Sequence, residues 1–150
     1  MSQRTRPAEV THLRIQLMSL ARRLRREAHS DEQSWARLLL LGAIDRHGGT
    51  ATPSALAADQ GMQSSNLAAA LRDLASEGLI ARTPDSEDRR KVRVALSEAG
   101  RALLRDNRAR REGWLASAMG ACLSDEESAL LVAAGELIER IATYSGEEPA

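Results

Sequence analysis

Apolar residues recur at spacings of three and four along most of this 150-residue chain, a pattern that restricts it to a mainly helical fold. Two stripes stand out, near the N-terminus (Val10, Leu13, Leu17, Leu20 and Leu24) and near the C-terminus (Leu130, Ala134, Leu137 and Ile141). Only 2% of the residues are aromatic, so leucine and alanine must fill the core. The same scarcity argues against binding of single-stranded nucleic acid, which usually stacks on aromatic rings.

Capping residues and glycines divide the helical pattern into segments. Ser30 with Gln33 predicts a capping box, and the helix that follows should end at His47–Gly49. Thr52 with Pro53 predicts the start of a third helix, which Gly61 interrupts. A fourth helix should run from about Ser64 to Gly78, and a long fifth helix from Ser97–Glu98 to about Gly120. Ser124 with Glu127 predicts a capping box that opens a sixth helix.

The third and fourth segments have the spacing of a helix-turn-helix. This motif needs a small residue where its helices cross, a glycine at the turn and apolar contacts further on. Ala57, Gly61, Leu67 and Ala70 occupy these places. A helical hairpin used only for packing has the same spacing. However, the fourth helix would leave short polar side chains such as Ser65 and Asn66 exposed, and these suit the major groove of DNA.

A β-hairpin with a basic tip is predicted directly after the helix-turn-helix. Strands are expected over Leu79–Thr83 and over Val92–Leu96, where apolar residues alternate, with turn residues over Pro84–Asp88. Arg89 and Arg90 lie at the tip, and Arg93 is expected on the solvent side. Arginines at such a tip favour insertion into a minor groove. The alternative is a charged tip that only protects an edge strand.

These segments resemble the MarR (multiple-antibiotic-resistance regulator) family over roughly Ala8–Tyr144. Asp85–Gly100 is similar to the family's wing motif, in which Asp88 and Arg90 match the Asp-x-Arg and Ser97 replaces a commoner threonine. Gly78–Arg82 is similar to its entry to the wing. The resemblance implies that Arg90 enters the minor groove and that Asp88 helps organise the wing. It also implies a dimer built on the first, fifth and sixth helices, and a response to small, often phenolic, ligands or to oxidants.

The prediction is therefore a mainly α fold with a small β-hairpin wing, in a single domain over 1–150. Within it, 31–100 form the winged helix-turn-helix, and 8–29 with 101–145 form dimerisation helices, because their apolar stripes must be buried somewhere. The residues expected to contact DNA are Gln63, Ser64, Ser65, Asn66, Ala69, Arg72, Asp88, Arg89, Arg90 and Lys91. The residues expected in the dimer are Leu13, Leu17, Leu20, Leu130, Leu137 and Ile141. Intramolecular packing of the stripes is the alternative.

The expected function is sequence-specific binding of a palindromic double-stranded operator by a homodimeric transcription regulator, a repressor that a small-molecule effector releases. The formal net charge is zero, but residues 63–111 hold eleven basic and seven acidic residues, whereas 121–150 hold one and seven. This asymmetry suggests one surface that faces DNA and one that does not. The alternative is a winged-helix module that binds proteins and no DNA.

Other function classes lack their motifs. The histidines and Cys122 have no metal-ligand spacing, and phosphate-binding loops and nucleophile elbows are absent, so we expect neither an enzyme, a metal nor a cofactor. A cytoplasmic location without membrane contact is expected, since no apolar run approaches about 18 residues and the polar, basic N-terminus is not a secretory signal. Cys122 has no basic residue within ten positions, which favours a structural cysteine over a redox sensor. The effector site stays open, with His12, Trp35 and Trp114 as guesses.

Overall fold

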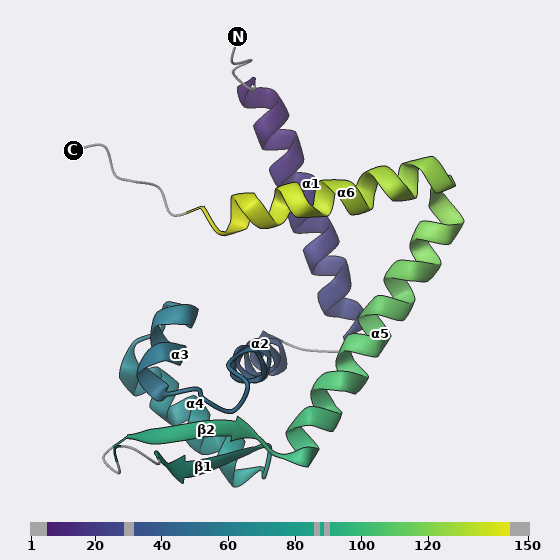
Figure 1. Ribbon diagram of the computed structural model, residues 1–150. Coiled ribbons are helices and arrows are strands. Elements are labelled where there is room, and N and C mark those ends of the chain that lie inside the picture. Colours follow the sequence, from purple (N-terminus) through teal and green to yellow (C-terminus); the bar gives the residue numbers. More distant parts are fainter. Residues whose placement is uncertain (1–5, 29–31, 86–87, 89–90, 145–150) are drawn as a thin grey trace, which may run out of the picture. The chain divides into compact units, whose positions relative to one another are not determined.

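The computed structural model describes residues 6–28, 32–85, 88 and 91–144, and it confirms the predicted mainly helical fold with one antiparallel hairpin (Figure 1). In chain order the elements are α1 (Pro7–Glu27), α2 (Glu32–Arg46), α3 (Pro53–Gln60), α4 (Ser64–Ser76), β1 (Ile80–Pro84), β2 (Val92–Leu96), α5 (Glu98–Cys122) and α6 (Asp125–Ala142). The chain forms two compact units, residues 1–111 and 112–150.

Local capping explains where the helices begin. The Thr52 hydroxyl accepts a hydrogen bond from the Ala55 amide at 3.3 Å, which satisfies a free donor at the start of α3. At the start of α6, the Ser124 hydroxyl accepts from the Glu127 amide at 3.2 Å, and the Glu127 carboxylate accepts from the Ser124 amide at 2.8 Å. Both predicted caps are confirmed, whereas the capping box predicted at Ser30 lies outside the described residues.

A leucine-rich core holds α2, α3, α4 and the hairpin together in the first unit. Its fully buried side chains include Leu41 and Ile44 of α2, Leu56 of α3, Leu71 of α4 and Val94 of β2. Burying one such side chain contributes roughly 1.5–3 kcal/mol. The three helices therefore pack on one another and on the hairpin, which lies beneath α3 and α4 in Figure 1.

The hairpin pairs Ile80 with Leu96 at its base and Pro84 with Val92 at its outer end. On the other side of β2, the Val94 amide donates to the Ala51 carbonyl at 2.8 Å, so β1 is the edge strand. The prediction ended the first strand at Thr83 and placed Pro84 in the turn, which was wrong by one residue. An edge strand tolerates a proline because it need not donate to a further strand.

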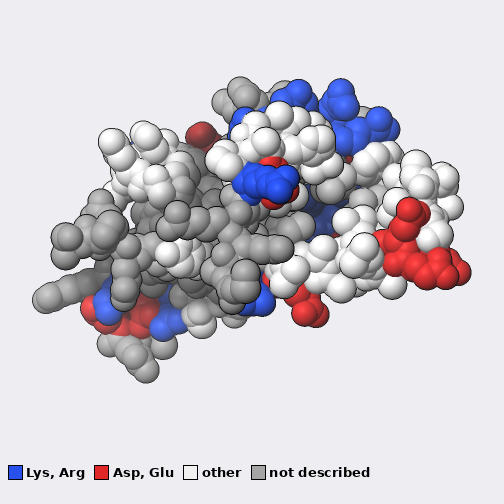
Figure 2. Space-filling model, turned by 90° about the horizontal axis from the view of Figure 1, so that it is seen from above, with Lys and Arg blue, Asp and Glu red and all other residues white. Residues whose placement is uncertain are grey.

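The terminal helices each carry apolar side chains that the chain itself leaves exposed. In α1 these include Leu13, Leu17 and Leu20, and in α6 they include Leu130, Leu137 and Ile141, which is 68% exposed. Cys122, at the end of α5, is also exposed. The first turn of α6 is acidic, and Asp and Glu side chains form a compact red group at the right of Figure 2. None of the helices in the described ranges has the length and apolar character needed to cross a membrane.

Candidate nucleic-acid interface

The turn between α3 and α4 depends on the backbone of Gly61. This residue has φ +58°, the left-handed region that favours glycine, and its amide donates to the Ala58 carbonyl at 3.2 Å. The Met62 amide donates to the Ala57 carbonyl at 3.0 Å, which closes the end of α3. Apart from its two chain neighbours, no described residue has an atom within 4 Å of the place where a Cβ of Gly61 would stand, so the need for glycine is conformational rather than steric. The structure thus confirms the predicted helix-turn-helix, with α3 and α4 joined by a turn at Gly61.

Helix α4 has one buried face and one open face. Leu67, Leu71 and Leu74 are at most 1% exposed and fix the helix against the core. Five of the six residues predicted to contact DNA from this helix and its cap are exposed: Gln63, Ser64, Ser65, Asn66 and Arg72. Ala69 is half-buried. Gln63, rather than Ser64, is the N-cap residue, and its side chain makes no capping hydrogen bond. The open face therefore begins at the first turn, where a major-groove helix makes its base contacts.

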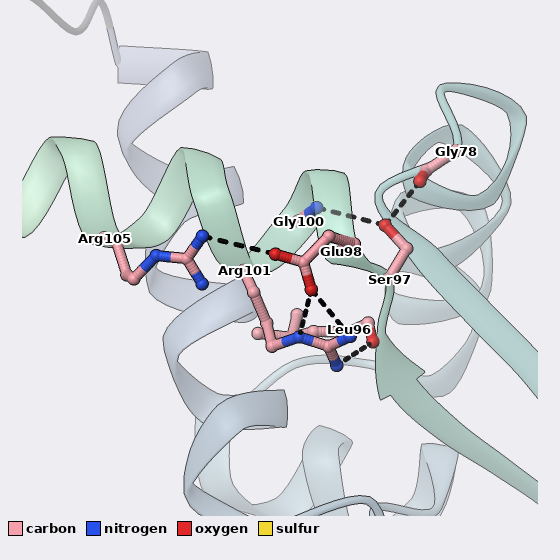
Figure 3. Close-up of polar contacts among 7 residues, drawn as sticks. All are labelled: Gly78, Leu96, Ser97, Glu98, Gly100, Arg101 and Arg105. Atoms are coloured by element: carbon pink, nitrogen blue, oxygen red, sulfur yellow. Dashed lines mark hydrogen bonds and ion pairs between the residues drawn. The ribbon is translucent and has the colours of Figure 1, made fainter.

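The end of α4 is fastened to the start of α5 (Figure 3). Gly78, with φ +72°, follows Glu77, the C-cap residue of α4, and its carbonyl accepts from the Ser97 hydroxyl at 2.5 Å. The Ser97 amide donates to the Leu79 carbonyl at 3.0 Å, and the Ser97 hydroxyl also accepts from the Gly100 amide at 3.0 Å. Ser97 thus caps α5 and binds the turn after α4 at the same time. The position of α4 is consequently tied to that of α5.

Glu98 adds a polar cluster to the first turns of α5 (Figure 3). Its carboxylate accepts from Arg105 at 3.3 Å and from Arg101 at 3.2 Å. Hydrogen bonds from Arg105 and then Arg101, with the positive charge of both, lower the pKa of Glu98 below its usual 4.5. Arg101 also donates to the Leu96 carbonyl at 2.9 Å, which links the cluster to the end of β2.

At the wing, a buried carboxylate lies three residues before Asp88, the acid that the family resemblance singles out. Asp85 is 5% exposed, forms an ion pair with Arg93, and accepts from the Asp88 amide at 3.0 Å through Oδ1. Its own amide donates to the Lys91 carbonyl at 2.9 Å, and the Lys91 amide donates to the Asp88 carbonyl at 2.8 Å. Asp88 is half-buried and Lys91 is exposed. Arg89 and Arg90 lie outside the described residues.

The sequence reasoning missed Asp85 and placed Arg93 on the solvent side. Arg93 pairs with Thr83 across the hairpin, and Asp85 follows two residues after Thr83. Residues separated by two share one face of a strand, so Asp85 and Arg93 are diagonal neighbours. The register of the hairpin was the signal that could have found this pair.

Two further side-chain contacts connect α2, and the residue after it, to other parts of this unit: one is an ion pair and the other a hydrogen bond. Arg37 of α2 contacts Glu77, the residue that ends α4. The Nε2 atom of His47, just after α2, lies 2.7 Å from an oxygen of Asp59 in α3. The sequence predicted His47 only as part of the end of the second helix, and its partner in α3 was not foreseen. Both contacts help to hold the helix-turn-helix on α2.

A cavity of about 380 Å³ lies between α2 and α5 in the first unit. Its lining residues are Ala28, Ser34, Arg37, Leu38, Leu41, Leu103, Asn107 and Arg110. Asn107 is 2% exposed and donates to the Ala28 carbonyl at 3.3 Å, while its Oδ1 atom has no hydrogen-bond partner among the described residues. None of the three guessed effector residues lines this cavity. Trp35 contacts the guanidinium groups of Arg25 and Arg111, which lie 5.7 and 5.2 Å from its ring centre, and it lines a smaller cavity of about 160 Å³.

The described residues contain no group of three His, Cys, Asp or Glu side chains that could hold a metal ion. Three features characterise the first unit: the open face of α4, the ion pair inside the hairpin and the cavity between α2 and α5.

Comparison with known proteins agrees with this geometry. Residues 34–91 match the model of the MarR family. An HTH-type transcriptional regulator of Mycobacterium tuberculosis is 32% identical over 126 residues, which cover 84% of this chain and 87% of that protein. A Pseudomonas aeruginosa protein, whose crystal structure is described as that of a candidate transcriptional regulator, is 53% identical with a TM-score of 0.82, covering 91% of this chain and 94% of that one.

A DNA complex also shares the fold. FabT of Streptococcus pneumoniae, solved in complex with DNA, has a TM-score of 0.66 at 19% identity, with 90% of this chain and 94% of that chain covered. At this identity the likeness concerns the fold alone. The relative from Mycobacterium tuberculosis and the family match together decide the classification: this chain belongs to the MarR family of winged helix-turn-helix transcription regulators.

Proposed function

We propose that this transcription regulator binds a palindromic DNA duplex as a homodimer, with α4 in the major groove and the hairpin wing along the minor groove. The observation that carries the proposal is the open face of α4, whose opposite face is fully buried in the core. A helix held in this way presents its first turn at a defined angle, which base recognition requires. The structure of FabT with DNA supports this use of the fold by analogy.

Each element has a separate role in this proposal. Asn66 and its neighbours Gln63, Ser64, Ser65, Ala69 and Arg72 would contact base edges and nearby phosphates. The wing residues Asp88, Arg89, Arg90 and Lys91 would meet the adjacent minor groove and backbone. Base edges in the major groove distinguish all four base pairs, whereas the minor groove code is degenerate. Specificity would therefore come mostly from α4, and affinity largely from the wing.

The dimer would be held by helices within 8–29 and 101–145. The exposed leucines of α1 and the exposed Leu130, Leu137 and Ile141 of α6 support this assignment, since such apolar faces need a partner. A twofold dimer would match two operator half-sites about one helical turn apart. That 1–150 act as one domain is part of the same prediction.

Repression with release by a small molecule is the proposed mode of action. The cavity between α2 and α5 supports it, because it has a volume suited to a small ligand and contains a buried amide oxygen without a partner among the described residues. A ligand there would lie next to Arg37, whose ion pair reaches the end of α4. A ligand could thus alter the position of the helix that reads DNA.

A binding selection on random duplexes, followed by a mobility shift, tests the proposal. A palindromic consensus bound by a dimer is the expected result. Absence of any preference for duplex DNA over competitor would instead favour the alternative, a winged-helix module that binds proteins only. Transcription from a promoter carrying the selected site would then distinguish repression from activation.

A further inference from the structure

We infer that Asp85 and Arg93 together position the wing for DNA, and that Arg93 serves this purpose rather than contacting a phosphate itself. This inference rests on the proposed function, in which the wing meets DNA. The acidic residues of the wing present a difficulty for DNA binding. A carboxylate in a wing that approaches phosphates should weaken binding, yet residues 85–93 contain Asp85, Glu87 and Asp88.

The burial of Asp85 resolves this difficulty for one of the three acids. Its side chain is 5% exposed, whereas that of Arg93 is 32% exposed. A buried carboxylate is costly unless it is paired and hydrogen-bonded, and Asp85 has both kinds of partner. Its Oδ2 atom accepts from Nε of Arg93, and its Oδ1 atom accepts from the Asp88 amide at 3.0 Å. The charge of Asp85 is therefore compensated inside the wing and is not presented to DNA.

The same carboxylate residue joins three points of the wing. The ion pair with Arg93 connects Asp85 to β2. The Asp85 amide donates to the Lys91 carbonyl at 2.9 Å, which connects it to the residue just before β2. The Asp88 amide adds a third connection. Asp85 consequently fixes where Asp88 and Lys91 lie relative to the strands. Lys91 is exposed, so this position decides how its ammonium group meets a phosphate backbone.

Asp85 sets the orientation of the Arg93 guanidinium, and the N–H donors on its Nη atoms lie where that orientation places them. Its Nε atom is directed to the buried carboxylate, and turning the guanidinium outward would break this hydrogen bond. Pairing with DNA would also break the ion pair between Arg93 and the buried Asp85, which is unfavourable. Asp85 and Arg93 should therefore act as one unit that positions the wing. Lys91, by contrast, is exposed and free of this pair, so it can contact a phosphate directly.

Removing the charge of Asp85 tests the inference, because the two explanations predict opposite changes in DNA affinity. Asp85→Asn retains an oxygen that can accept from the Asp88 amide but loses the ion pair. Simple electrostatics predicts tighter DNA binding, because a negative charge is removed. We expect instead a loss on the order of tenfold in affinity for the selected operator, since the wing is no longer held. The matched control Glu87→Gln removes the same charge two residues away and should bind equally well or more tightly.

A double-mutant cycle tests the second half of the inference. Arg93→Gln should weaken binding about as much as Asp85→Asn, and the double variant should be no weaker than either single variant, because one unit is removed only once. Affinities are measured by fluorescence anisotropy at two salt concentrations. Tighter binding by Asp85→Asn, or a double loss equal to the product of the single losses, would show Arg93 to be an independent phosphate contact and overturn the inference.

Hydrogen exchange on the free protein makes the test independent of DNA. In the parent, the Asp88 and Lys91 amides should be protected. Asp85→Asn should reduce the protection of both, because its neutral oxygen accepts less strongly and the ion pair with Arg93 is lost, while the amides of the β1–β2 ladder keep their protection. Asp85→Ser, which also offers an acceptor, provides a second variant if the first folds poorly. Unchanged protection in both variants would refute the positioning role of Asp85. If the parent itself does not bind duplex DNA, the proposed function fails, and the exchange result alone decides the role of Asp85.

Discussion

Gly100 of α5 packs directly against the carbonyl group of Leu79, at the joint between α4, β1 and α5. A Cβ built on Gly100 would overlap the carbonyl oxygen of Leu79 and lie 3.1 Å from its carbonyl carbon. Both obstacles are backbone atoms, which cannot turn away as a side chain can. Since the Leu79 carbonyl also accepts from the Ser97 amide, any side chain at Gly100 must separate α5 from the turn that ends α4.

Gly100→Ala should therefore destabilise the protein by about 1–3 kcal/mol, the range for inserting a methyl group into a filled site. The control is Gly113→Ala in the same helix, where no atom lies within 4 Å of the new Cβ. That change should stabilise by about 0.5–1 kcal/mol through helix propensity. Urea unfolding of the three proteins measures both values. A loss of stability that is equal in the two variants would show that the Leu79 contact does not matter.

The cluster around Glu98 predicts a specific pH dependence. Because Arg105 and Arg101 lower the pKa of Glu98, the group stabilises the folded state above its usual pKa of 4.5, and this contribution disappears as the pH falls through the lower folded value. Glu98→Gln should thus be less stable than the parent at pH 7, and the difference should shrink on acidification below about pH 4.5. Unfolding curves at several pH values test this, with Glu136→Gln of α6 as a control. A difference that stays constant to about pH 3 would contradict the assignment.

The exposed stripe of α6 predicts that dimerisation depends on this helix. Each buried Leu or Ile contributes roughly 1.5–3 kcal/mol, so Leu130, Leu137 and Ile141 from two copies can sustain a tight dimer. Removing residues 124–150 should give monomers or aggregates in light scattering. Removing only 145–150 keeps α6 and should leave the dimer intact. A monodisperse dimer after the longer truncation would assign the interface elsewhere.

Cys122 should be dispensable for control of DNA binding. It is exposed, but the chain has no basic residue within ten positions on either side to favour the reactive thiolate. We expect Cys122→Ser to bind the operator as the parent does, and peroxide to release neither protein. Release of the parent alone in a mobility shift would identify Cys122 as a redox sensor.

Features encoded by neighbouring residues could be predicted from the sequence. The caps at Thr52 and Ser124, the turn at Gly61 and the strand Val92–Leu96 each depend on a few adjacent residues, and all four were found. The family resemblance then supplied the expected roles of Asp88 and Arg90 and the helices expected in the dimer.

Interactions between distant segments could not be predicted in this way. The ion pair of Arg37 with Glu77 joins residues forty positions apart, and the interaction of His47 with Asp59 depends on how α3 packs beside α2. Asp85 and Arg93 are close in sequence, but their pairing requires the register of the hairpin. The cavity beside Asn107 is formed by side chains of segments that meet only in the fold.

The division of labour between α4 and the wing is the central claim about function. Asn66 lies on the open face of α4, and a good bidentate contact to a base edge is worth about 1–3 kcal/mol of discrimination. Arg90 belongs to the basic tip that the family resemblance assigns to the minor groove. Replacing Asn66 by alanine should therefore change base preference, whereas replacing Arg90 should change affinity and its salt dependence.

Binding selections with the parent, Asn66→Ala and Arg90→Ala at two salt concentrations test this claim most directly. Asn66→Ala should relax the preference at one symmetric base position in each half-site and leave the salt dependence nearly unchanged. Arg90→Ala should keep the consensus, weaken binding to most sequences, and reduce the salt slope by about one unit for each phosphate that a copy no longer neutralises. If Arg90→Ala retained the affinity and the salt slope of the parent, the wing would not contact DNA and the central claim would be wrong.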